Sequence, residues 1–498
     1  MSLNMKSDQE RQPARNGLGG QAARGAAFTG LSQAVKLGTQ FLSVIFLSRL
    51  LTPADFGLVA MCTPVIAFVT MAQNMGLSQA VVVAEVITPG QSSTLFWVNV
   101  GLALVLTLGL IGLSPVIADF YHTPNLEQLI IVMSFCILMS GLSAQHGALV
   151  TRAMKFSRLA IIDMACAILG LAGALLWAVL APGPMALIAM SLTSSLTLLV
   201  GVWASSEWRP GKLAPFSAVA SMLRFGGGLS TFTLSNFFAR SLDNILIGRF
   251  IGAQQLGLYD RAYKLLLFPL QQITYPLSRV MVPVLSRLVN EPARYRSAYA
   301  RTVGQILLVT TPGTLTLFIL ADAAIPLALG PQWSHAASIF RWLALAALHQ
   351  SMTATIGWLF ISQSRMREYA HWGLFNAFSC AIAFAVGLRW GVEGVAACYA
   401  LSDIFIRLPA LWLFIGRRGP VTTQDLANIA APFLLAGMAS AAALALVTLP
   451  LKIPSLALLV VGLIISYGTF VATLLLTSRG RAIVVETFGM MKMILQKV

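Results

Sequence analysis

The sequence predicts an all-α membrane protein of about 14 transmembrane helices. Hydrophobic residues make up 57% of the 498 residues and charged residues only 10%, whereas soluble domains carry about 25% charged residues. So few charges cannot cover a soluble surface, and the apolar faces must therefore meet lipid. The apolar residues fall in runs close to the ~20 residues that a helix needs to cross the hydrocarbon core, and the links between the runs are short.

The elements follow from these runs in chain order. Residues 1–25 are polar and basic, so we expect a disordered cytosolic N-terminus without a cleavable signal peptide. Residues 478–498 place apolar side chains at helical spacing beside Lys492 and Lys497, which predicts a basic amphipathic helix on the cytosolic surface. The expected spans between these ends are 26–50, 57–83, 92–114, 127–150, 159–181, 184–206, 222–250, 263–287, 302–322, 336–361, 368–388, 392–416, 427–449 and 454–477.

The basic residues give the orientation. The net charge of +16 arises mostly from Lys and Arg in alternate links between the runs. This is the pattern of the positive-inside rule, so we expect a multi-pass protein with both termini in the cytosol. The same pattern accounts for the basic charge without nucleic-acid binding.

An internal repeat divides the chain. The segment from Arg49 to Leu58 resembles the segment from Arg249 to Leu258, and an offset of this size spans six helices. Because six is even, the two halves have the same orientation across the membrane, as in transporters with the substrate path between parallel repeats. The predicted units are an N-lobe at 26–212, a C-lobe at 213–418, two additional helices at 419–477 and the tail at 478–498.

Polar side chains recur three and four positions apart on the leading helix of each half. An ionisable group at bilayer depth costs at least ~2.5 kcal/mol, so such groups should face protein or water. We infer that the two leading helices face each other across a hydrated central cavity. The polar stripe comprises Gln33, Lys36, Gln40 and Ser43 on the first helix, and Thr233, Asn236, Arg240 and Asp243 on the seventh.

Cations outnumber anions within the spans, which favours an anionic substrate and phosphate above all. In the alternative, Arg240 and Asp243 form a structural ion pair and Lys36 extends to an interface. Asp403 and Arg407 are expected to pair on their own helix. The predicted substrate contacts are Lys36, Arg240, Arg279, Arg341 and Arg24, of which Arg24 alternatively serves only as a topology signal. Arg261 and Lys264 are gate candidates, and Asp163, Asp243 and His349 are candidates for coupling to H⁺ or Na⁺.

The motifs of catalysis are absent from the sequence. It has no Gly-x-x-x-x-Gly-Lys-Ser/Thr, His-Glu-x-x-His, Cys-x-x-Cys or Asp-x-Asp. We therefore expect no ATP hydrolysis, no metal site and no other cofactor. The rival functions are a membrane glycan polymerase or ligase, which needs a larger outer loop, and a cation-coupled drug exporter. Drug cations would need acidic cavity residues, of which the spans offer only Asp163, Asp243 and Asp403.

Three segments carry a family resemblance. They begin at Leu47-Ser-Arg-Leu-Leu-Thr-Pro-Ala-Asp-Phe-Gly57, at Ile247-Gly-Arg-Phe-Ile-Gly-Ala-Gln-Gln-Leu-Gly257, and at Val282-Pro-Val-Leu-Ser-Arg-Leu. Together they resemble the polysaccharide-transporter branch of the multidrug/oligosaccharidyl-lipid/polysaccharide exporter superfamily, and most of all its Wzx-type flippases for colanic acid and succinoglycan.

The resemblance implies two six-helix lobes in a V, with alternating access. It implies a substrate of undecaprenyl pyrophosphate carrying an oligosaccharide, in a bacterial inner membrane, with a polymerase and an export complex as partners. Basic residues on the first and eighth helices matter in lipid-flipping relatives, and the matching positions are Arg24, Lys36 and Arg279. The last two helices would guide the lipid tail.

Overall fold

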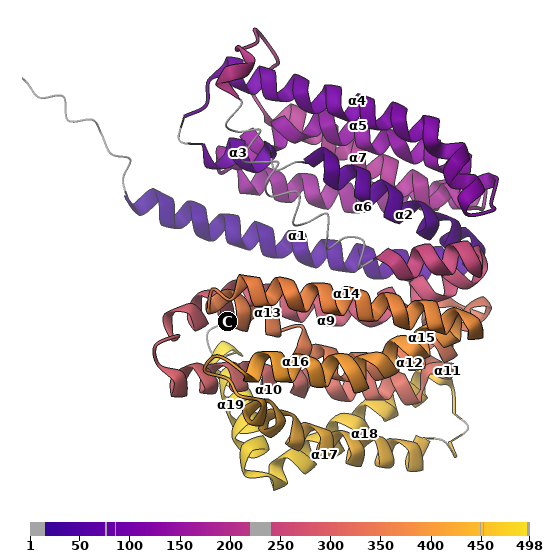
Figure 1. Cartoon of the computed structure of the whole chain (residues 1–498), viewed down its shortest axis with the longest axis vertical. Coiled ribbons are helices and arrows are strands. Elements are labelled where there is room, and N and C mark those ends of the chain that lie inside the picture. The colour runs from indigo at the N-terminus through magenta and orange to yellow at the C-terminus, as the bar shows by residue number, and fades with distance from the viewer. Residues whose placement is uncertain are drawn as a thin grey trace, which may run out of the picture.

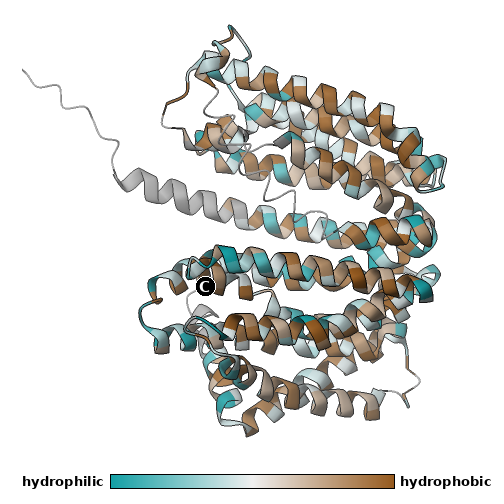
Figure 2. Cartoon of the chain, viewed as in Figure 1, coloured by the Kyte–Doolittle hydropathy of each residue, from teal (hydrophilic) through white to brown (hydrophobic). Residues whose placement is uncertain are grey.

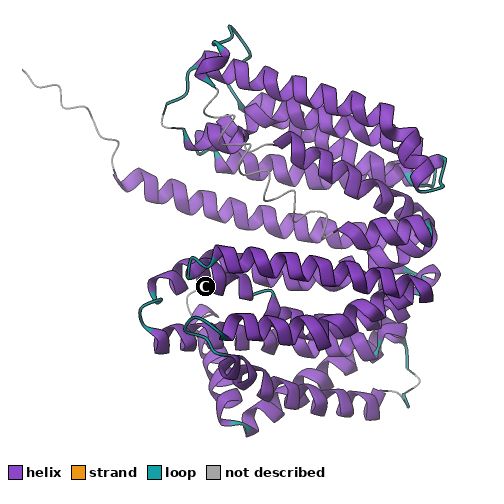
Figure 3. Cartoon of the chain, in the orientation of Figure 1, coloured by secondary structure: helices purple, strands orange, loops and turns teal. Residues whose placement is uncertain are grey.

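The computed structural model is helical throughout the residues that it describes, with no strand among them (Figure 3). The described residues are 15–74, 77–84, 86–219, 241–448, 450–451 and 453–495. Within them, ten helical segments are long and apolar enough to cross a membrane. This confirms the predicted fold class. The expected total of 14 spans remains a prediction. The ten segments include neither the helix Arg15–Leu50 nor the helix Ala253–Arg287, they count Met366–Gly416 once, and residues 220–240 lie outside the description.

Two groups of helices lie one above the other in Figure 1. Where the groups face each other, α1 borders the upper group and α14 borders the lower group. In the N-lobe, α1 packs on α6, and α4, α5 and α7 pack beside them. The N-lobe consists of α1 (Arg15–Leu50), α2 (Pro53–Asn74), α3 (Leu77–Val83), α4 (Pro89–Phe120), α5 (Asn125–Arg152), α6 (Phe156–Leu180), α7 (Met185–Ser205) and η1 (Phe216–Ala218).

In the C-lobe, α12 packs against α9, α10 and α15. Residues 241–250 are helical and precede this lobe's first long helix. The C-lobe continues with α9 (Ala253–Arg287), α10 (Pro292–Ile319), α11 (Ala321–Leu329), η2 (Pro331–Trp333), α12 (Ala336–Thr353), α13 (Ile356–Ser362), α14 (Met366–Gly387), η3 (Leu388–Trp390), α15 (Gly391–Ser402), the π-helix η4 (Asp403–Arg407) and α16 (Leu408–Gly416).

The last helices pack on the C-lobe, mainly on α10 and also on α11 and α16. They are α17 (Thr423–Thr448), α18 (Ser455–Leu476) and α19 (Ser478–Leu495). The pair α17–α18 matches the two expected additional spans. The position of α19 matches the expected amphipathic tail.

Local signals explain several helix ends. Thr88 and Gln91 form a capping box at the start of α4, which satisfies backbone N–H groups that have no partner inside the helix. Asp55 accepts hydrogen bonds from the backbone N–H and hydroxyl of Thr52 just before α2. The start of α1 differs from the prediction, because this helix begins at Arg15, inside the segment expected to be disordered. Residues 15–25 contain no proline to interrupt a helix that the following residues extend.

Hydrophobic residues occur along the helices of both lobes (Figure 2), and many of their side chains are exposed. On α4, Val105 is 66% exposed and Val116 is 62% exposed, and Leu446 on α17 is 78% exposed. In water such surfaces would be unfavourable, whereas in a bilayer they meet lipid tails. The exposed flanks therefore agree with the membrane-spanning fold.

Candidate functional site: the lobe seam and the buried polar groups

The lobes meet where α2 crosses α9. A Cβ atom at Gly57 would lie 1.7 Å from the carbonyl oxygen of Ala253, and one at Gly257 would lie 1.8 Å from the carbonyl oxygen of Pro53. No side chain fits at either position. Small residues at such a crossing let two helix backbones approach closely, which is how helices associate in the absence of a hydrophobic driving force.

The crossing has the symmetry of the sequence repeat. Gly57 and Gly257 occupy equivalent positions in the two aligned segments. Gly57 packs against Ala253, and Gly257 packs against Pro53, which is the residue equivalent to Ala253 in the repeat. The contact therefore joins equivalent surfaces of the two repeats, as in a two-fold symmetric dimer. We call this contact, together with the polar contacts described next, the lobe seam.

Polar groups join the lobes beside the glycines. The indole N–H of Trp333 donates to the carbonyl oxygen of Ser48 at 2.7 Å, and the Gln332 side-chain amide donates to the same oxygen at 2.7 Å. The Arg261 guanidinium lies 3.7 Å above the centre of the Phe56 ring, and that ring packs edge-on against Trp333. Arg261, a predicted gate candidate, thus contacts the opposite lobe.

Lys36 and Asp163 form an ion pair inside the N-lobe. The Lys36 Nζ atom lies 2.5 Å from a carboxylate oxygen of Asp163 on α6, and both side chains are part-exposed, at 35% and 45%. The pair joins a predicted substrate cation to one of the predicted coupling carboxylates. A charge on an apolar helix is stabilised by an opposite charge on a neighbouring helix, which a search along one helix cannot find.

The polar stripe of α1 is divided between two environments. Ser43 donates to the sulfur of Met190 on α7, so both Lys36 and Ser43 contact the N-lobe's own helices. Gln33 and Gln40 are exposed. Of the equivalent stripe, Thr233, Asn236 and Arg240 lie outside the described residues. The expectation that the two stripes face each other across a hydrated cavity therefore stays a prediction.

The other predicted substrate contacts have separate surroundings. Arg341 forms an ion pair with Asp322 of α11, near the start of α12 and not at mid-helix. Arg279 is exposed on α9, and within the described part of the chain no carboxylate pairs with it. Arg24 lies in α1, although its side chain is outside the description, as is all of Arg240. The structure does not bring these cations together into one cluster among its described residues.

A buried polar network occupies the core of the C-lobe. Arg407 is only 3% exposed and lies 3.1 Å from a carboxylate oxygen of Asp403, one turn earlier in the π-helix. The same guanidinium donates to the carbonyl oxygen of Tyr399 at 2.9 Å and contacts the sulfur of Cys380. This confirms the predicted Asp403–Arg407 pair. The π-helix widens the backbone here, a distortion common at functional positions.

Two of the coupling candidates border this network. Asp243 is 7% exposed and accepts hydrogen bonds from the Tyr259 hydroxyl at 3.1 Å and from the Asn244 backbone N–H at 2.8 Å. His349 Nε2 lies 3.3 Å from Asp403, close enough for an ion pair but not aligned for a hydrogen bond. Asp163, the third candidate, is in the other lobe. Within the described residues, no three acidic, histidine or cysteine side chains are placed to hold a metal.

Sequence reasoning missed most of the seam. Gly57 and Gly257 were recognised as repeat markers but not as a contact, and Phe56 and Trp333 were not singled out. The signal was present in the repeat, because two glycines at equivalent positions indicate a close backbone approach. No comparable signal identifies Trp333, whose partner is 285 residues away in the sequence.

Comparison with known proteins identifies the family. Residues 46–338 match the family described as "Polysaccharide biosynthesis protein". The chain is 24% identical over 394 residues to "Lipopolysaccharide biosynthesis protein WzxC" of Escherichia coli (strain K12), covering 78% of this chain and 80% of that protein. It is 28% identical over 324 residues to "Succinoglycan biosynthesis transport protein ExoT" of Rhizobium meliloti (strain 1021), covering 65% of each.

A solved structure shares the fold. The "Lipid II flippase MurJ, inward closed conformation" superposes with a TM-score of 0.71 at 14% identity, covering 92% of this chain and 99% of that one. This likeness shows that the two chains share a helical fold. The chain therefore belongs to the polysaccharide biosynthesis family, in the membrane-transporter branch that its motifs indicated.

Proposed function

We propose that this protein flips a lipid-linked oligosaccharide across a bacterial inner membrane during exopolysaccharide or lipopolysaccharide synthesis. The substrate is undecaprenyl pyrophosphate carrying an oligosaccharide repeat, moved from the cytosolic to the periplasmic leaflet. The relatives named for lipopolysaccharide and succinoglycan synthesis support the polysaccharide role. The lipid II flippase with the same fold supports a lipid-linked substrate.

The observation that carries the proposal is the lobe seam. The two repeat-related lobes meet at Gly57 and Gly257, which occupy equivalent positions in the repeats. Such a contact can close and open as a unit, because rigid lobes that rock about a central site are the usual basis of alternating access in repeat transporters. With both termini cytosolic, the short link between α1 and α2 is periplasmic. The seam is then the outer gate in its closed state.

Lys36 is the substrate contact that we propose first. Its part-exposed ion pair with Asp163 lets the ammonium exchange the carboxylate for a pyrophosphate, which carries more negative charge and more acceptor oxygens. Arg279, exposed on α9 of the other lobe, is the second proposed contact. Asp163, Asp243 and His349 are the groups proposed to couple H⁺ or Na⁺, and a polymerase and an export complex are the proposed partners.

Lys36→Ala is expected to abolish polymer production in cells lacking the wild-type gene, with lipid-linked oligosaccharide accumulating in the inner leaflet. Removing one charge-assisted phosphate contact costs about 1.5–3 kcal/mol, and the unpaired Asp163 would also repel the anion. Polymer yield and the amount of variant in the membrane are measured together. The control is Lys155→Ala, which removes a cation that pairs with Glu207 outside the spans.

Two further variants separate binding from a structural role. If Lys36 only neutralised its partner, Lys36→Ala/Asp163→Ala would restore polymer, because removing both members of an ion pair is far milder than removing one. We expect the double variant to stay inactive, because it lacks the cation that binds the pyrophosphate. A fully active double variant would contradict the role of Lys36 in substrate binding.

A further inference from the structure

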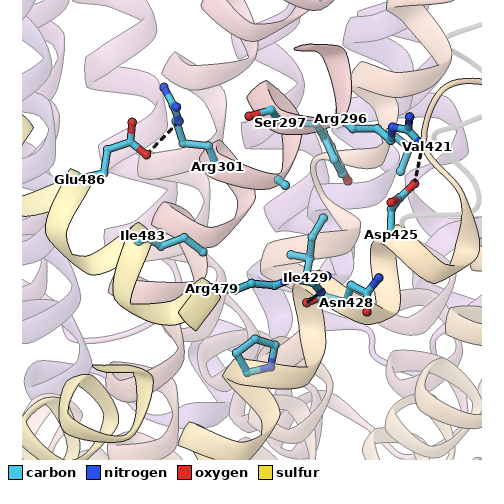
Figure 4. Close-up of a pocket in the computed structure, with 14 residues that line it drawn as sticks. Arg296, Ser297, Arg301, Val421, Asp425, Asn428, Ile429, Arg479, Ile483 and Glu486 are labelled. Atoms are coloured by element: carbon cyan, nitrogen blue, oxygen red, sulfur yellow. Dashed lines mark hydrogen bonds and ion pairs between the residues drawn. The ribbon is translucent and has the colours of Figure 1, made fainter. Parts of the chain in front are cut away.

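A cavity of about 420 Å³ lies on the flank of the C-lobe, between α10, α17 and α19. Figure 4 shows its labelled side chains, which come from the first turns of α10, the first turns of α17 and the adjoining face of α19. None of these helices contributes to the lobe seam. The cavity therefore belongs to neither the gate nor the proposed substrate contacts.

Three arginines and two carboxylates line this cavity. Arg301 pairs with Glu486 at 2.9 Å, and Arg296 approaches Asp425 at only 3.9 Å (Figure 4). Arg479 is exposed and reaches the carbonyl oxygen of Asn428 at 3.3 Å, with no carboxylate partner within the described residues. The lining thus carries one net positive charge, and the Arg479 guanidinium has N–H donors left for a further acceptor.

The position of α19 indicates what reaches the cavity. This helix directly follows the candidate span α18, and it exposes Val485 at 61% and Phe488 at 56% on either side of Glu486. A helix with basic residues and exposed apolar side chains beside a span lies in the membrane interface. The cavity is then at the level of the lipid headgroups, where a phosphate attached to a lipid tail is the abundant anion.

We propose that this cavity binds the phosphodiester of an anionic phospholipid. A phosphodiester carries one negative charge, equal to the excess charge of the lining. Arg479 supplies two parallel N–H donors to its oxygens, and Arg296 turns from its long contact with Asp425 to a third. Basic pockets between transmembrane helices on the cytosolic side recognise headgroups in this way. The bound lipid fastens α19 to α10 and α17, independently of the substrate that is flipped.

The test is native mass spectrometry of the full-length protein with phosphatidylglycerol and, as the zwitterionic reference, phosphatidylcholine of the same chains. We expect phosphatidylglycerol to bind at least about tenfold more tightly, and Arg479→Gln to lose about tenfold of that affinity. The matched control is Arg481→Gln, which removes an exposed arginine of the same helix that does not line the cavity.

Three results would overturn the proposal. Equal binding of the two lipids would mean that no headgroup site exists. An equal loss in Arg481→Gln would mean that the overall charge of α19, not the cavity, attracts the lipid. Binding of soluble glycerol phosphate as tightly as the lipid, and equally sensitive to Arg479→Gln, would identify a site for free phosphates. None of these results depends on transport, so they are distinct from a failure of the proposed flippase function.

Discussion

Replacing Gly57 by alanine is expected to abolish transport while leaving the folded protein in the membrane. The new Cβ atom would lie 1.7 Å from the Ala253 carbonyl oxygen. Overpacking usually costs about 1–3 kcal/mol even where side chains can yield, and here the neighbour is backbone. The strain is relieved when the lobes separate at the seam, so the variant should populate the state with the seam open.

Polymer yield and lobe separation measure this effect together. A shift of about 3 kcal/mol against the closed seam changes its population more than ~100-fold, so polymer synthesis should fall to background. Spin labels at Thr52 and Gln254, both exposed beside the seam, should show a longer distance than in the wild type. By the repeat symmetry, Gly257→Ala should behave in the same way.

Gly38→Ala provides the matched control. It lies on α1, and nothing lies within 4 Å of a Cβ atom built there. Alanine in a helix is more favourable than glycine by about 1 kcal/mol, so this variant should transport normally. Normal transport by Gly57→Ala, with an unchanged label distance, would refute the role of the seam as a gate that must close.

Arg407→Ala is expected to cause the largest loss of stability in the C-lobe. The substitution leaves Asp403 beside His349 but without its guanidinium partner, and it removes contacts to Tyr399 and Cys380. Breaking a buried ion pair by removing one partner costs about 3–5 kcal/mol. The purified variant should melt at a lower temperature, and less of it should accumulate in the membrane.

Two further variants show whether the loss of stability comes from breaking the ion pair or from removing any arginine. Arg417→Ala removes an exposed arginine at the end of α16 and should leave the melting temperature within the range of surface substitutions. Arg407→Met/Asp403→Leu removes both charges and should recover much of the stability, because no buried charge remains unpaired. If Arg407→Ala were as stable as Arg417→Ala, the network would not hold the C-lobe together.

The sequence was most informative where the signal is local or repeats. Each apolar run outside residues 220–240 corresponds to one or more helices among the described residues, because helix hydrogen bonds close within a few residues and hydropathy sets the span. The pair of Asp403 and Arg407 was predictable for the same reason, since its members are one turn apart. Helices also occupy the positions of the two expected additional spans and of the expected tail, whose roles stay predictions.

The contacts of the candidate site join residues that are far apart in the sequence, and no periodicity of the sequence encodes such contacts. Lys36 and Asp163 are 127 residues apart, so the sequence placed both in apolar helices without showing that they pair. Cations outnumber anions within the spans, but the described cations do not form one cluster. Arg341 has its partner on α11, and Arg407 is enclosed in the C-lobe.

By itself, the sequence determined that this protein is a helical membrane protein, that two of its segments repeat, and which family it resembles. These properties follow from composition and from residues near one another in the chain. Only the tertiary structure decided which charges are neutralised and where the lobes touch. Both depend on which helix faces lie against each other, and that is fixed by packing between segments more than one hundred residues apart.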